Sequence, residues 1–304
     1  MDNKFSTPKR FGEILDHTFQ LTKNRFKDLF MIMLIFMGPI YLIQAILQLS
    51  SGTSFFREVG SGGAWFEQII TSFEETGTFN TSSLGADIGI IIMGIVSAIL
   101  APVAEAAVLF TINHVRQNED YTVSSVIKQA FKRFWPIMGS SILFGLISLG
   151  IIILPIAIVA FTGAFVATSV NTVVGILLGV VLFLGFAVVV ALLLTRWSLY
   201  FGSVVLDKVS PGLGRSWRLS RKRTWVLLGL YLVFYFIISC ISFGVQMTFG
   251  LVLGNSVLLT LISNLVSLVT TMIFSVGYAV MYLDAKTRHD ADDLKEMIEE
   301  FKTV

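Results

Sequence analysis

The chain has 304 residues, of which 55% are hydrophobic and 14% charged, and its formal net charge is +2. Average soluble domains carry about 25% charged residues, so this composition excludes a soluble globular domain, a disordered chain and a disulfide scaffold. The near balance of 22 basic and 20 acidic residues creates no overall positive field, and we expect no nucleic-acid partner.

The N-terminal segment is polar and lacks the short apolar core and cleavage site of a secretory signal. Within 8–28, apolar side chains such as Phe11, Ile14 and Phe19 recur at helical spacing among charged ones. This segment is too charged to cross a bilayer. We expect it to form an amphipathic helix that lies in the membrane interface.

Six apolar stretches are long enough to cross a membrane, because a spanning helix needs about 20 apolar residues. They are 29–49, 88–112, 135–160, 173–195, 225–247 and 257–283. Turns are expected within 161–172, which contains Thr162-Gly163 and Asn171, and within 248–256. The chain is therefore predicted to be an all-α, polytopic integral membrane protein with six transmembrane helices in three hairpins.

Two more short segments, 122–134 and 211–223, precede the third and fifth stretches and combine apolar and basic side chains. A Ser or Thr cap followed by Pro predicts that the last of them begins at Ser210-Pro211. Each hairpin would thus follow one interfacial amphipathic helix. All three units would form a single membrane domain over 1–304.

The distribution of Lys and Arg predicts the orientation in the membrane. Every Lys and Arg except Arg57 lies in the N-terminal segment, in the loops after the second and fourth stretches, or in the tail 284–304. Since basic loops stay on the cytoplasmic side, both termini are expected to be cytoplasmic. The acidic segment 50–87 would be the extracellular loop.

Three parts of the chain resemble a known family. They are 10–30 (RFGEILDHTFQLTKNRFKDLF), the run from Pro102 through TVSSVIKQAF (122–131), and 211–232 (PGLGRSWRLSRKRTWVLLGLYL). Together they resemble the membrane domain of bacterial glycerophosphoryl diester phosphodiesterases and its stand-alone relatives. The resemblance implies an integral membrane module of the bacterial plasma membrane. Fused members carry a catalytic domain after this module, and here we expect none, so phosphodiesterase activity is not implied.

The densest charge in the chain is a candidate lipid-headgroup site formed by Arg215, Arg218, Arg221, Lys222 and Arg223. Each basic residue near an anionic leaflet contributes about 1 kcal/mol, and guanidinium groups match phosphate geometry. We therefore expect the bilayer and its anionic lipids as partners. The alternative is that these residues are ordinary cytoplasmic-side charge.

Glu105 is the only formal charge inside a predicted span, and it follows Pro102 closely. Carboxylates in a span are candidates for ion or proton sites. Arg196, at the end of the fourth stretch, is within reach of such a group in some helix arrangements. Glu105 and Arg196 therefore form a second candidate site. The alternative is a polar contact that fixes helix packing.

No motif of a catalytic or metal site is present, because His17, His114 and His289 lie far apart in the sequence. We expect no catalytic residues, no metal and no cofactor.

The acidic tail from Asp290 to Phe301 is a candidate surface for a protein partner, in a separate helix capped by Asp290. The favoured function is a non-enzymatic membrane scaffold or accessory protein. The alternatives are a transporter or permease subunit with Glu105 in its path, and an intramembrane lipid-processing enzyme.

Overall fold

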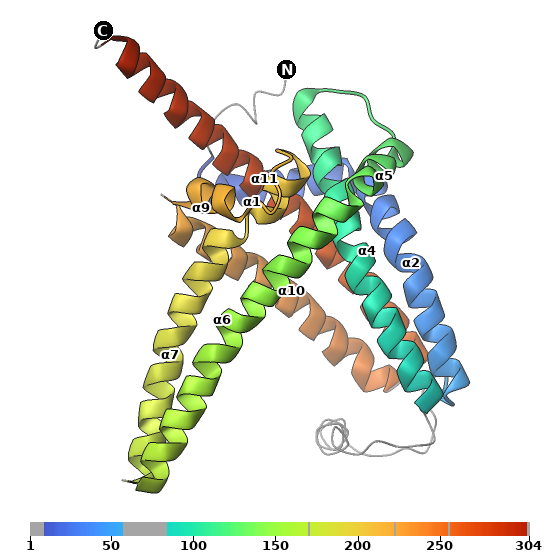
Figure 1. Cartoon of the computed structure of the whole chain (residues 1–304). Coiled ribbons are helices and arrows are strands. Elements are labelled where there is room, and N and C mark those ends of the chain that lie inside the picture. The colour runs from blue at the N-terminus through green and yellow to red at the C-terminus, as the bar shows by residue number, and fades with distance from the viewer. Residues whose placement is uncertain (1–8, 57–83, 170, 222, 255, 303–304) are drawn as a thin grey trace. The chain divides into compact units, whose positions relative to one another are not determined.

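The computed structural model describes residues 9–56, 84–169, 171–221, 223–254 and 256–302, and these residues form helices and their connections without any strand. The helices, shown in chain order in Figure 1, are α1 Phe11–Asn24, α2 Phe26–Ser50, α4 Leu84–Gln117, α5 Val123–Lys132, α6 Phe134–Ser169, α7 Thr172–Trp197, α8 Tyr200–Val205, α9 Leu213–Ser220, α10 Thr224–Leu253 and α11 Val257–Lys302. The predicted all-α class is confirmed.

Six of the described helical segments are long and apolar enough to cross a membrane, as predicted. They lie in α2, α4, α6, α7 with α8, α10 and α11. Along α6 and α7, large apolar side chains such as Leu146, Leu154 and Val181 are exposed. Exposed apolar surface of this extent suits contact with lipid rather than with water. The orientation of the chain remains a prediction.

A short helix, a break at basic residues and a long helix follow one another three times in the described segments. Arg25 separates α1 from α2, Arg133 separates α5 from α6, and Arg221 and Arg223 lie between α9, which ends at Ser220, and α10, which begins at Thr224. The start of α5 is fixed by reciprocal bonds in which the Ser125 amide donates to Thr122 Oγ1 and the Thr122 amide donates to Ser125 Oγ. Their position in a membrane interface and the arrangement in three hairpins remain predictions.

The predicted start of a helix at Ser210-Pro211 is wrong. Helix α9 begins at Leu213, because Gly212 has φ +77° and left-handed backbone cannot continue an α-helix. A Cβ at Gly212 would lie 2.7 Å from the Tyr200 carbonyl oxygen, so the chain needs glycine at this close approach. The short helix α8, which the sequence analysis missed, precedes this turn.

The turn predicted within 161–172 is much shorter than expected. Helix α6 continues through Thr162 and Gly163 to Ser169, and Asn171 caps α7 by accepting a bond of 2.8 Å from the Val173 amide. Thr162 is accommodated because its hydroxyl donates to the Ile158 carbonyl, at 2.6 Å. Gly163 faces the backbone of α7, where an added Cβ would be 3.6 Å from the Gly175 oxygen. The turn within 248–256 is likewise short, since α10 runs to Leu253.

The tail prediction is wrong in one respect. Helix α11 continues without a break through Asp290 to Lys302, so Asp290 lies inside a helix and caps nothing. The expectation of a partner surface rests on the side chains of 292–301, of which the structure describes only the helical backbone. Much of the predicted loop 50–87 lies outside the described residues.

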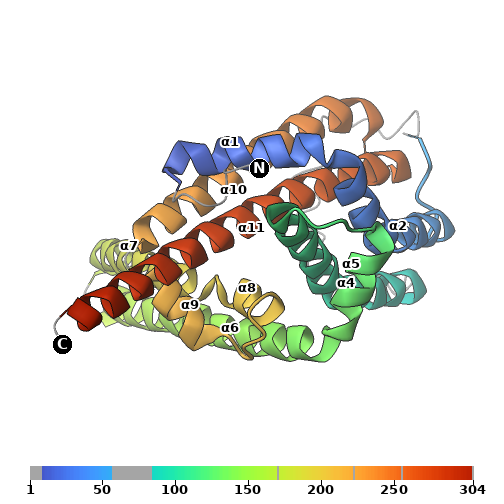
Figure 2. The same ribbon diagram turned by 90° about the horizontal axis from the view of Figure 1, so that it is seen from above.

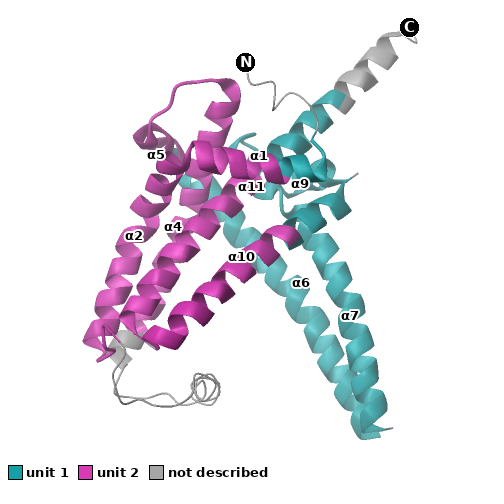
Figure 3. Cartoon of the chain, turned by 180° about the vertical axis from the view of Figure 1, so that it is seen from behind, with its two compact units in different colours: residues 1–14, 131–232, 279–304 teal, residues 15–130, 233–278 magenta. Residues whose placement is uncertain are grey.

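The chain divides into two compact units, which are coloured separately in Figure 3. Unit 1 comprises Met1–Ile14, Phe131–Leu232 and Ala279–Val304, and unit 2 comprises Leu15–Ala130 and Val233–Tyr278. In unit 1, α6 packs along α7, and α8 and α9 lie beside each other near one end of α6 (Figure 2). In unit 2, α2 packs along α4, and the Phe234 ring lies against Gly277, where a Cβ would be only 2.4 Å away. The prediction of a single domain over 1–304 stays a prediction.

Candidate functional site

Helix α9 is fixed to the C-terminal end of α7 by two buried serines. Ser216 Oγ and Ser220 Oγ both donate to the Arg196 carbonyl oxygen, at 2.8 and 3.0 Å. The last carbonyls of a helix have no partner within it. The spacing of the two serines, one helical turn apart on α9, brings both hydroxyls to the same orphan carbonyl, so the sequence of α9 is suited to this position.

Removing both hydroxyls should loosen α9. We expect the double variant Ser216→Ala/Ser220→Ala to lose about 1–2 kcal/mol of stability, because the part-buried Arg196 carbonyl loses both of its hydroxyl donors. Each single variant should lose less, since one hydroxyl remains. Thermal unfolding of the purified protein in detergent, followed by tryptophan fluorescence, measures the change. Ser124→Ala, at an exposed position on α5, is the control. Equal melting temperatures of the double variant and the control would contradict the role given to these serines.

The guanidinium of Arg196 is held between three helices of unit 1. Its carbon Cζ lies 4.5 Å from the centre of the Trp217 ring, which is a cation–π contact. Its Nε donates to Thr224 Oγ1 at 3.4 Å, and Thr224 Oγ1 in turn donates to the Ser220 carbonyl at 3.0 Å. Arg196 of α7 thus touches α9 and the start of α10. The predicted pairing of Arg196 with Glu105 stays a prediction.

These three helices line an open pocket of about 340 Å³ within unit 1, which we call the arginine pocket. Its polar wall is formed by Arg196, Trp217, Arg221, Arg223, Thr224 and Trp225, and its apolar wall by Val189, Leu192, Leu193 and Val226. None of these lining residues is acidic. The pocket therefore combines three positive charges with an apolar surface and suits an anionic ligand that has an apolar part.

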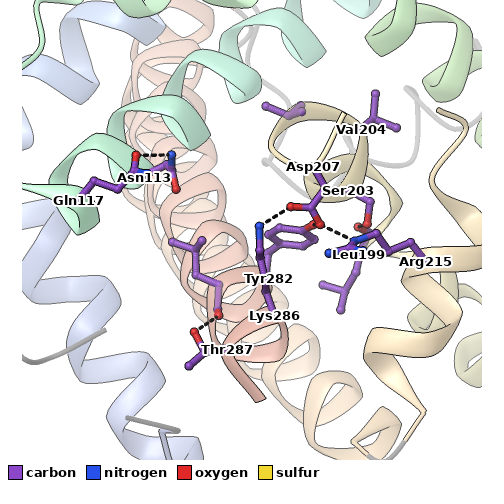
Figure 4. Close-up of polar contacts among 12 residues, drawn as sticks. Asn113, Gln117, Leu199, Ser203, Val204, Asp207, Arg215, Tyr282, Lys286 and Thr287 are labelled. Carbon is purple, nitrogen blue, oxygen red and sulfur yellow. Dashed lines mark hydrogen bonds and ion pairs between the residues drawn. The ribbon is translucent and has the colours of Figure 1, made fainter. Parts of the chain in front are cut away.

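Arg215 does not line this pocket, because it pairs with Asp207 instead. Asp207 also accepts a hydrogen bond of 2.6 Å from the Tyr282 hydroxyl and one from Lys286 Nζ (Figure 4). Burial raises the pKa of Asp207, but the bonds from Lys286 and Tyr282 and the nearby charges outweigh burial and hold that pKa below its ordinary value. We call these four residues the Asp207 cluster.

A second buried carboxylate, Asp284, lies on α11 itself and accepts bonds on a different side of that helix from Tyr282 and Lys286. Arg223 donates to Asp284 Oδ2 at 3.0 Å, and Arg288 donates to the same oxygen at 2.9 Å. The Lys9 amide donates to Oδ1 at 2.7 Å, and Arg288 also donates to the Lys9 carbonyl at 2.7 Å. This Asp284 cluster (Lys9, Arg223, Asp284 and Arg288) ties the segment before α1 and the turn before α10 to α11.

The predicted headgroup residues therefore fall into different environments. Arg221 and Arg223 line the arginine pocket together with Arg196, whereas Arg218 is exposed on α9 and does not line it. Arg215 belongs to the Asp207 cluster. Lys222 lies outside the described residues. The structure thus brings part of the predicted cluster to one pocket and uses the rest elsewhere, and lipid binding by any of them stays a prediction.

Glu105 lies in α4, in unit 2, between alanines that are fully buried. Its own side chain is half-buried. Its neighbours Ala104 and Ala106 pack inside unit 2, so the carboxylate is placed at the edge of that packed face. The role of Glu105 in a transport path stays a prediction.

Sequence reasoning missed Trp217, Thr224, Asp207, Asp284 and Tyr282. One signal was available, since Asp207 is the only acidic residue between Asp120 and Asp284 in the whole sequence. An isolated carboxylate near a basic segment needs a cationic partner when it is buried. Nothing in the spacing shows which cation that would be, because Asp207 and Lys286 are far apart in the chain.

In the part of the chain that the structure describes, no three His, Cys, Asp or Glu side chains lie together as they would in a metal site. His114 contacts Glu119 at 2.7 Å and Gln129 at 3.2 Å.

No protein-family model matches the chain, and neither a curated protein nor a solved structure matches it. Within its described residues, the molecule is a helical protein with six potential membrane-spanning helices and a basic pocket.

Proposed function

We propose that this protein is a non-enzymatic scaffold or accessory protein of the bacterial plasma membrane that gathers anionic lipids around the ends of its helices. The observation that carries the proposal is the concentration of cations at one end of α7 and α10. Arg196, Arg218, Arg221 and Arg223 all belong to the end of α7, to α9 or to the turn before α10. Beside them lie the exposed apolar side chains of α7 and Trp225, which is 67% exposed.

The proposal includes a topology. Three hairpins, each after an interfacial helix, would leave both termini and these cations on the cytoplasmic side, where anionic lipids attract basic segments. The resemblance to the membrane domain of bacterial glycerophosphoryl diester phosphodiesterases supports a bacterial membrane module without assigning it a reaction. The acidic tail is proposed as the contact for a protein partner.

Lipid that co-purifies with the protein tests the function. We expect anionic phospholipids to be enriched around the protein, relative to the extracted membrane, when it is purified in mild detergent and its lipids are measured by mass spectrometry. Neutralising Arg218 and Arg221 together to Gln should reduce the enrichment by up to about fivefold per charge, since each contributes about 1 kcal/mol. High salt should act in the same direction.

The matched control is Arg218→Lys/Arg221→Lys, which keeps both charges and should keep the enrichment. A bound lipid mixture identical to that of the membrane, in the wild type and in both variants, would show that the protein has no preference for anionic lipid and would overturn the proposal.

A further inference from the structure

We infer that the arginine pocket binds one anionic glycerophospholipid, with the phosphate on Arg196 and Arg221 and an acyl chain along Val189, Leu192 and Leu193 of α7. This inference rests on the proposed function and goes further. It assigns a single defined site and a ligand class, where the proposed function requires only a general preference for anionic lipid.

Unused hydrogen-bond donors are the first argument. Each guanidinium has five N–H groups. Arg196 gives its Nε–H to Thr224, and Arg223 gives one from Nη1 to Asp284, while no residue within the described ranges accepts from the Arg221 guanidinium. Most donors of the three groups therefore remain for a ligand. Because the pocket lining contains no carboxylate, phosphate oxygens are the acceptors that suit them best.

Two of the three arginines are also held in place before any ligand binds. Arg196 is fixed by Trp217 and Thr224, and Arg223 is fixed by Asp284. Fixed side chains lose little conformational entropy on binding, which favours a specific site over a diffuse attraction. Arg221 is the exposed member, and it is free to close over the phosphate.

The shape of the pocket selects an amphipathic ligand. Val189 lies about 10 Å from Arg196 along α7, at 1.5 Å per residue, so the pocket changes from cationic to apolar over that length. Its volume of about 340 Å³ is at the lower end for ligand sites. It holds a phosphate with a small alcohol and the beginning of a chain. Inorganic phosphate fills only the arginine end.

Binding to the purified wild-type protein in detergent tests the site. The probes are phosphatidylglycerol, phosphatidylcholine and inorganic phosphate, followed by the fluorescence of Trp217 and its neighbours and by native mass spectrometry. We expect one molecule of phosphatidylglycerol per chain, with at least tenfold weaker binding of the other two probes. Arg196→Gln and Arg221→Gln should each weaken phosphatidylglycerol binding at least tenfold, as the loss of a charged hydrogen bond does.

Arg218→Gln is the matched control, because Arg218 is exposed on the same α9 and does not line the pocket. Its loss of phosphatidylglycerol affinity should not exceed the about fivefold expected of one diffuse charge and should disappear at high salt, whereas the loss in Arg221→Gln should persist. The Arg221→Gln variant should fold normally, since the wild-type Arg221 guanidinium has no acceptor among the described residues. This variant therefore keeps the test valid even if Arg196→Gln fails to fold.

Three results would overturn the site. Equal affinity for inorganic phosphate would make it an anion site without a lipid. Equal affinity for phosphatidylcholine, whose choline offsets the charge of its phosphate, would show that the pocket does not select lipids of net negative charge. Equal, small and salt-sensitive losses in Arg218→Gln and Arg221→Gln would show diffuse attraction, which defeats the site but leaves the proposed function standing. The proposed function fails separately, if anionic lipid is not enriched at all.

Discussion

The variant Asp207→Ala is expected to lose about 3–5 kcal/mol of stability, because it leaves two partly buried cationic groups without their counter-charge. The Asp207 side chain is only 5% exposed and receives bonds from Arg215, Lys286 and Tyr282. The two cations are about a quarter exposed, so water can relieve part of the loss and the lower end of the range is the better expectation. Thermal or denaturant unfolding in detergent gives the value.

Two further variants separate charge from hydrogen bonding at this site. Asp207→Asn keeps the shape of the side chain and removes its charge, so it should lose nearly as much stability as Asp207→Ala. Tyr282→Phe removes one hydroxyl and should lose about 1 kcal/mol. If Asp207→Asn were as stable as the wild type, the ion pairs would contribute nothing and the account of this cluster would be wrong.

The same cluster makes stability depend on pH in a defined direction. The pKa of Asp207 is lower in the folded protein than in the unfolded chain, where an aspartate has a pKa of about 3.9. Its contribution is therefore complete above about pH 4 and is lost as the pH falls through the folded pKa. The difference in melting temperature between the wild type and Asp207→Asn should be constant near neutral pH and should narrow in acid.

The second large effect is expected for Gly202→Ala in α8. A Cβ at Gly202 would lie 2.3 Å from Cδ2 of Tyr282 and 2.4 Å from Cγ. The Tyr282 ring is fully buried and its hydroxyl is bonded to Asp207, so it has no space into which to move. Overpacking of this kind costs about 3 kcal/mol, which exceeds the gain of up to about 1 kcal/mol that alanine brings to a helix.

Gly214→Ala, in α9, is the matched control, because nothing lies within 4 Å of its added Cβ. It should be neutral or slightly stabilising in the same unfolding measurement. The double variant Gly202→Ala/Tyr282→Leu should lose less than the sum of the two single losses, since the clash disappears with the ring. Strict additivity, or a stable Gly202→Ala, would contradict the close approach of α8 and α11.

The sequence predicted the helices well and their contacts poorly, for physical reasons. Length and apolarity determine whether a segment can span a bilayer, and both are local properties, so all six segments were found. The turn predicted at Thr162-Gly163 is wrong, because the low helix propensity of threonine and glycine is outweighed inside the long helix α6, where the Thr162 hydroxyl donates to the Ile158 carbonyl. Asp207 and its partners were missed because Tyr282 and Lys286 reach it only through the tertiary fold.

In the candidate site, too, local properties could be predicted from the sequence and tertiary contacts could not. The basic cluster was visible in the sequence, because charge density is a local property. Which of its members line a pocket depends on partners elsewhere in the chain. Arg215 pairs with Asp207, and Arg223 donates one N–H to Asp284. Trp217 and Thr224 became relevant only when α9 was placed against the end of α7.

The two carboxylate clusters grip α11 from different sides. Tyr282 and Lys286 are one turn apart and hold Asp207, while Asp284 and Arg288, also one turn apart, form the Asp284 cluster. At about 100° per residue, the two pairs point about 200° apart around the axis. Rolling α11 about its own axis, or sliding it lengthwise, would therefore break one set of ion pairs whichever way it moved. Inside unit 1, these ion pairs on two sides of α11 therefore oppose its rotation about its own axis.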